Sequence, residues 1–147
     1  MDMVLLFVGR LHPLVIHFPI ALIVVATLFE LGRGVWPGRP WSRAIPAILL
    51  VAAATSLLAV GTGWLFAEDF APPPSQKRDL FLHRVLGVAM TVVTLLAARV
   101  ASRSMERETG GIAWIRRGLI LLAAGLVVVT SHLGALMVWG ADYFTGE

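Results

Sequence analysis

The sequence predicts an all-α integral membrane protein, an antiparallel bundle of four transmembrane helices with both termini in the periplasm. Three observations predict this fold. First, 58% of the 147 residues are hydrophobic and only 14% are charged, whereas about a quarter of the residues in a soluble domain are charged. Second, four apolar segments are each close to the ~20 residues that a helix needs to cross the hydrocarbon core. Third, arginine is concentrated in two of the connecting segments. The length fits a single domain over residues 1–147.

The four segments follow one another along the chain, with helix-breaking residues between them. They cover about residues 14–31, 45–66, 80–98 and 118–139. Pro46 falls in the first turn of the second segment, where proline is tolerated, and the proline-rich run 71–75 separates the second segment from the third. The N-terminus is not typical of a signal peptide, because it has an acidic second residue and no basic n-region. We therefore expect the first helix to be retained.

The basic residues predict the orientation of the bundle. Eight lie after the first and third segments, namely Arg33, Arg39, Arg43, Arg99, Arg103, Arg107, Arg116 and Arg117. Four lie toward the other side, namely Arg10, Lys77, Arg78 and Arg84. By the positive-inside rule the arginine-rich side is cytoplasmic, which predicts periplasmic termini and a place in the bacterial inner membrane. The net charge of +3 does not indicate nucleic-acid binding, because the basic residues are confined to these segments.

Four histidines are the candidate site residues, and this topology places all of them in the periplasmic half. His12 and His17 open the first segment, His83 lies near the start of the third, and His132 lies about two turns before the end of the fourth. Ionisable residues inside a membrane are costly, which favours a functional explanation. His12 is five residues before His17, about 140° round a regular helix. Unless Pro13 distorts that turn, we expect His17 rather than His12 to face His83 and His132.

Small residues accompany these histidines at helical spacing. His83 and Gly87 share a stripe on the third segment, and Gly63 belongs to a similar stripe on the second. Stripes of small residues allow either close packing of helices or room for a flat group inside the bundle.

Three interpretations of the histidines compete. The absence of cysteine excludes thiolate zinc sites, cysteine-ligated iron–sulfur clusters and covalently attached haem. In the first interpretation two imidazoles hold a non-covalent haem b, with His17 and His83 favoured and His132 as the competitor. Arg84 would then pair with a propionate, and Gly87 and Gly63 would make room for the macrocycle.

The other two interpretations involve no haem. The histidines could hold copper or zinc, for which Asp142 is the only carboxylate nearby on the fourth segment. They could also be structural, bonded to backbone carbonyls that Pro13 and Pro19 leave without partners.

Three motifs carry a family resemblance across nearly the whole chain. They are His12-Pro13-Leu14-Val15-Ile16-His17-Phe18-Pro19, then His83-Arg84-Val85-Leu86-Gly87, and finally the stretch from Thr130 through His132 to Asp142-Tyr143. Together they resemble the signature of a largely uncharacterised bacterial family of four-helix membrane proteins, often linked to periplasmic c-type cytochrome domains. The chain is also similar to four-helix b-type cytochromes. Ser131 and Ala135 depart from the pattern, because glycine is usual in the family at both positions.

The resemblance implies haem b and electron exchange with a periplasmic c-type cytochrome or an oxidoreductase subunit of a larger respiratory complex. We therefore expect a membrane-embedded b-type cytochrome, an electron-transfer protein or subunit more than an enzyme on its own. Two questions stay open: whether a quinone binds near Trp64 and Phe66, and whether the protein forms a homo-oligomer. The alternative from a different class is a cofactor-free membrane anchor or assembly subunit.

Overall fold

The computed structural model describes residues 2–36, 40–70, 72–104, 110–140 and 146. This described part is helical and contains no strand, and four of its helical stretches are long and apolar enough to cross a membrane. They are Met3–Val35, Ile45–Asp69, Pro74–Ser104 and Gly110–Trp139. The predicted fold class is therefore confirmed. Each stretch runs beyond the segment predicted from sequence, because flanking residues such as Arg99 and Arg103 are also good helix formers.

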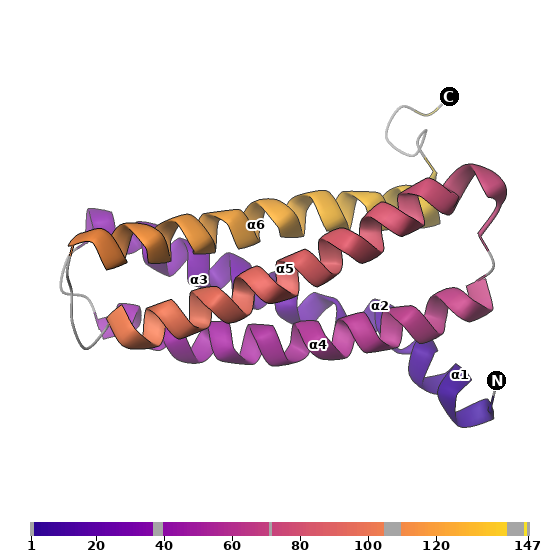
Figure 1. The fold of residues 1–147 in the computed structure, drawn as a ribbon, viewed down its shortest axis with the longest axis horizontal. Helices are drawn as coiled ribbons and strands as arrows, with labels where there is room; N and C mark the ends of the chain where they lie inside the picture. The colour runs from indigo at the N-terminus through magenta and orange to yellow at the C-terminus, as the bar shows by residue number, and fades with distance from the viewer. Residues whose placement is uncertain (1, 37–39, 71, 105–109, 141–145, 147) are drawn as a thin grey trace.

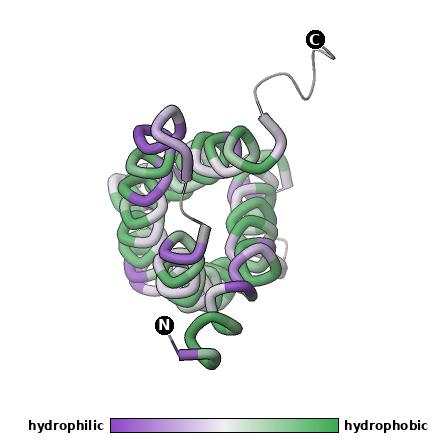
Figure 2. The backbone as a smooth tube through the Cα atoms, turned by 90° about the vertical axis from the view of Figure 1, so that its right-hand side faces the viewer, coloured by the Kyte–Doolittle hydropathy of each residue, from purple (hydrophilic) through white to green (hydrophobic). Residues whose placement is uncertain are grey.

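The helices form an antiparallel ring. The first stretch consists of α1 (Met3–Arg10), α2 (His12–Val15) and α3 (His17–Val35), and the others are α4 (Ile45–Phe70), α5 (Lys77–Ser104) and α6 (Gly110–Trp139). Short 3₁₀ turns, η1 (Pro40–Ala44) and η2 (Pro74–Gln76), precede α4 and α5. Neighbours in sequence pack together, and α3 closes the ring against α6 (Figures 1 and 2). Helix α3 therefore lies diagonally opposite α5.

The first stretch is interrupted at Leu11 and Ile16. Pro13 and Pro19 explain the breaks, because proline has no N–H and its ring clashes with the carbonyl four residues earlier. Both α1 and α2 pack against α4, and α1 turns away from the bundle axis (Figure 1). Gly9 permits this contact, since a Cβ at that position would lie 2.9 Å from the backbone nitrogen of Phe66.

The interior of the bundle is lined mostly with small and branched apolar residues. Two buried clusters fill it, one of Ala26, Ile45, Leu49, Ala97, Ala98, Ala101 and Ile120, the other of Ile23, Ala52, Met90, Ala123 and Val127. Large apolar side chains point outward instead, as lipid-facing surfaces require. Buried Ser56, Thr91 and Thr94 each donate to a carbonyl four residues earlier, so these hydroxyl protons are satisfied within their own helices.

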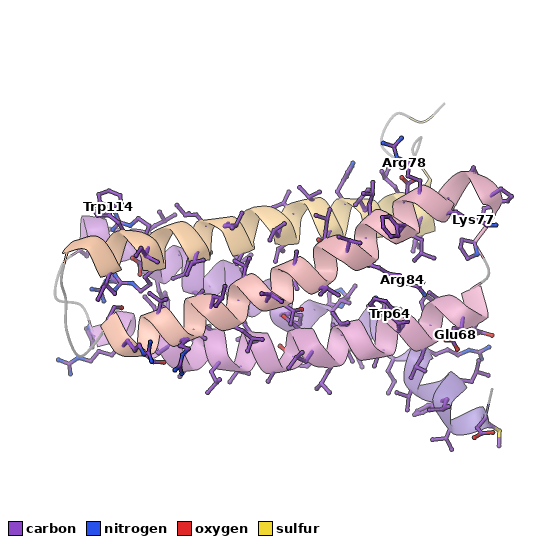
Figure 3. All side chains as sticks on the ribbon, in the orientation of Figure 1. Trp64, Glu68, Lys77, Arg78, Arg84 and Trp114 are labelled. Atoms are coloured by element: carbon purple, nitrogen blue, oxygen red, sulfur yellow. The ribbon has the colours of Figure 1, made fainter. Side chains whose placement is uncertain are left out.

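The charged residues divide between two ends. The arginine-rich end comprises the C-termini of α3 and α5 and the N-termini of α4 and α6; its described arginines are Arg33, Arg43, Arg99, Arg103, Arg116 and Arg117. The opposite end, called the histidine end below, carries Arg10, Lys77, Arg78 and Arg84. Figure 3 shows three of these basic residues far from Trp114. The predicted segregation of charge is thus present, while the side of the membrane that each end faces stays a prediction. Arg39 and Arg107 lie outside the described residues.

Candidate functional site

Two of the four histidines meet at the histidine end. The rings of His12, on α2, and His83, on α5, have centroids 6.5 Å apart and planes at 90°. Both side chains are partly buried. His17 and His132 are exposed. The candidate site is therefore built around the pair His12–His83.

The sequence-based expectation that His17, and not His12, faces His83 does not hold in the structure. The expectation assumed a regular helix from residue 12 to residue 17. The breaks at Leu11 and Ile16 remove that assumption, because each changes the rotation of the chain about the helix axis. His12 is thereby turned toward α4 and α5.

His83 is oriented by a hydrogen bond to the backbone of α6. Its Nδ1 lies 2.9 Å from the carbonyl oxygen of Thr130. A carbonyl oxygen can only accept, so Nδ1 carries the proton and donates it. In the neutral ring the lone pair then sits on Nε2, the state in which imidazole binds a metal ion. Gly134 lets the ring approach α6, since a Cβ there would lie 3.2 Å from Cε1 of His83.

His12 contacts α4 through the corresponding ring atom. Its Nδ1 lies 3.3 Å from Oγ1 of Thr62. The Thr62 hydroxyl has a single proton and also lies 2.9 and 3.1 Å from the carbonyl oxygens of Leu58 and Ala59. When that proton goes to a carbonyl, the hydroxyl accepts from Nδ1 of His12, and Nε2 carries the lone pair of the neutral ring. The ring of Phe66 stacks on His12, with centroids 6.1 Å apart.

Gly63 and Gly87, the two glycines predicted to make room for a haem macrocycle, have different surroundings. Gly63 accommodates His12, because a Cβ there would lie 2.8 Å from Cε1 of the ring. The space beside Gly63 is thus taken by the imidazole itself. At Gly87 a Cβ would meet only Cγ2 of Thr130, at 3.9 Å, which is an ordinary contact.

Unpartnered polar atoms lie on the residues around the histidine pair. The Arg84 guanidinium lies over the ring of Trp64, 5.0 Å from its centroid (Figure 3), and its buried Nε has no hydrogen-bond partner. Oγ1 of Thr130 and Oε1 of Gln76 are buried and unpartnered as well. Buried polar groups normally find partners, so these atoms favour the presence of a polar ligand near His83.

The donor set fits haem iron better than zinc. Within the described ranges, no three His, Cys, Asp or Glu residues are grouped so that they could hold a metal ion, whereas structural zinc takes four ligands and catalytic zinc three. Haem iron needs only two axial ligands from the protein. The two rings, with centroids 6.5 Å apart, would supply that number of imidazoles. Asp142 and Tyr143 lie outside the described residues.

Thr62 could not be singled out from sequence, and Thr130 and Gly134 entered only as members of the third motif, with no role assigned to them. Threonine and glycine are common in transmembrane helices, where they serve packing. Their spacing to a histidine on another helix depends on how the helices are rotated, which no local pattern records.

The fold and this site define a four-helix membrane protein with a paired-histidine centre near one end of the bundle. The model of a family described as "Predicted membrane protein (DUF2231)" matches residues 10–145. The chain belongs to that family. No curated protein and no solved structure matches the chain.

Proposed function

We propose that the protein is a membrane-embedded b-type cytochrome that transfers electrons, with haem b held between His12 and His83. The observation that carries the proposal is the meeting of two rings, 6.5 Å apart, that both engage a neighbouring helix through Nδ1. Haem supplies reversible one-electron transfer, and ligation by two imidazoles leaves no open position for a substrate. The function is therefore that of a carrier.

The surrounding residues would orient the ligands and balance charge. The Thr130 carbonyl holds the Nδ1 proton of His83, and the Thr62 hydroxyl would do the same for His12, which gives both rings the tautomer that coordinates iron. Arg84 would bind a propionate through the buried Nε that has no partner in the protein. Gly63 and Gly134 would let the two rings lie against their neighbouring helices.

The location follows from the predicted orientation. With the histidine end toward the periplasm of a bacterial inner membrane, the haem would lie close to that surface. Its partner would then be a periplasmic c-type cytochrome or a subunit of an oxidoreductase. A quinone site near Trp64 and Phe66 stays a prediction; the Phe66 ring stacks on His12 and the Trp64 ring lies beneath Arg84.

The test is a reduced-minus-oxidised visible spectrum of the detergent-purified protein, with pyridine haemochrome and metal analysis of the same sample. We expect a low-spin b-type spectrum with about one haem per chain, as one pair of axial imidazoles allows. His12→Ala and His83→Ala should each abolish it while the protein still inserts.

His17→Ala and His132→Ala are the matched controls, because both histidines are exposed. They should leave the spectrum unchanged. If His17→Ala removes the haem and His12→Ala does not, the ligand assignment is wrong although the function stands. A colourless protein made with ample haem would overturn the function. Bound copper would then favour a two-imidazole copper site, and no metal at all would favour a cofactor-free anchor or assembly subunit.

A further inference from the structure

A buried ion pair ties three helices together near the arginine-rich end. Glu30 on α3 and Arg116 on α6 are 1% and 2% exposed. Arg116 donates from Nε to Oε2 of Glu30 at 2.9 Å and from Nη2 to Oε1 at 3.0 Å. Its Nη1 donates to Oγ of Ser104 on α5 at 2.7 Å. The carboxylate and the Arg116 guanidinium thus neutralise each other in a bidentate pair.

Arg117 adds a second guanidinium that this carboxylate does not satisfy. Its Nε lies 3.7 Å from Oε1 of Glu30, and this buried nitrogen has no hydrogen-bond partner. Arg33 interacts electrostatically with Glu30, Arg116 and Arg117, which adds to the positive potential. With Arg33, three guanidinium groups therefore lie around one carboxylate, which leaves the cluster with an excess of positive charge. A partly buried excess of charge is costly, so the arrangement favours binding of an anion at the partly exposed Arg117.

Arg117 is partly exposed, beside a tryptophan of the kind that lies at membrane interfaces. Its side chain is 33% exposed, and the guanidinium lies 5.1 Å from the centroid of the Trp114 ring. Trp114 is itself 70% exposed, at the end of the bundle (Figure 3). Tryptophan concentrates at the membrane–water interface. Beside Arg117 stands Gly34, where a Cβ would meet nothing within 4 Å except Nη2, at 3.8 Å.

We propose that Arg117, Gly34 and Trp114 form a binding site for the phosphate of an anionic phospholipid. The planar guanidinium suits two phosphate oxygens. The missing side chain at Gly34 leaves room for the headgroup, and the Trp114 ring packs beside the glycerol and upper acyl chain. Basic sites between transmembrane helices commonly bind such headgroups. The inference concerns the end of the bundle opposite the histidine pair and does not depend on haem binding.

Native mass spectrometry of the detergent-purified full chain tests the site. The protein is titrated with phosphatidylglycerol or with phosphatidylcholine, and the bound lipids are counted. Both lipids carry a phosphate, but in phosphatidylcholine the choline ammonium neutralises its charge, so we expect the anionic lipid to bind about tenfold more tightly beside the arginines. Arg117→Gln should remove this preference. Arg103→Gln, which deletes one exposed arginine at the same end, should keep it.

Two further arms keep the test decisive if Arg117→Gln fails to fold. Gly34→Leu retains every charge but fills the space beside Nη2, and it should lower binding of phosphatidylglycerol as well. Inorganic phosphate should not displace the lipid. Equal binding of the two lipids by the unmodified protein would overturn the site, as would equal losses in the Arg103 and Arg117 variants. Displacement by inorganic phosphate would show that the ligand is free phosphate.

Discussion

At the scale of single residues, the candidate site depends on two hydrogen bonds and on two glycines. The carbonyl of Thr130 holds the Nδ1 proton of His83, and the hydroxyl of Thr62 lies within hydrogen-bond distance of Nδ1 of His12. Gly63 and Gly134 provide the space in which the rings lie. Helix α4 offers a matched pair of glycines with which this role can be tested, because Gly61 has nothing within 4 Å of its Cβ position.

We expect Gly61→Ala and Gly63→Ala to behave differently. Alanine stabilises a helix by roughly 0.5–1 kcal/mol relative to glycine, so Gly61→Ala should raise the thermal stability slightly. At Gly63 the new methyl would lie 2.8 Å from Cε1 of His12, which forces the ring to move. In Gly63→Ala the gain in thermal stability should therefore disappear, and the haem spectrum should weaken or shift. Thermal unfolding and visible spectra of both variants check this, and two equally stabilised variants with normal spectra would contradict it.

At the scale of helices, the sequence predicted the elements but not their rotation. The apolar segments located all four helices, since length and hydropathy decide what can cross a bilayer. His83 and Arg84 stood out in the sequence because ionisable residues are rare inside such a helix. The meeting of His12 with His83 could not be predicted, because the proline-induced breaks around α2 decide which way His12 points. Glu30 pairs with Arg116, 86 residues away, and no local pattern in the sequence indicates that pairing.

The Glu30–Arg116 pair gives a prediction about how the helices are held together. Glu30→Gln keeps the shape of the side chain but leaves the Arg116 charge buried without its counter-charge, so we expect a loss of roughly 3–5 kcal/mol in the free energy of unfolding. Glu68→Gln, at an exposed position, should change it by less than about 0.5 kcal/mol. Detergent-based unfolding measures both. Combining Glu30→Gln with Arg116→Gln should recover part of the loss; equal effects of Glu30→Gln and Glu68→Gln would contradict the role.

At the scale of the whole molecule, the antiparallel ring places different polar residues at its two ends. Because neighbouring helices alternate in direction, segments distant in sequence arrive at the same end. His12 and His83 gather at one, and Glu30, Ser104 and Arg116 near the other. The separation would let the proposed haem site and the proposed lipid site occupy one small bundle without interfering. Which end faces the periplasm then decides which partners the proposed haem could reach.

The absence of cysteine makes this orientation directly measurable. Ser75→Cys places one thiol at the histidine end, and Gly110→Cys places one at the arginine-rich end; both positions are exposed. Because arginine-rich segments stay in the cytoplasm, a membrane-impermeant maleimide should label Ser75→Cys in cells whose outer membrane alone has been permeabilised. Gly110→Cys should react only after lysis, and the unmodified chain serves as the blank. The reverse pattern would turn the histidine pair toward the cytoplasm, and the proposed exchange with a periplasmic cytochrome would then fail even if the protein binds haem.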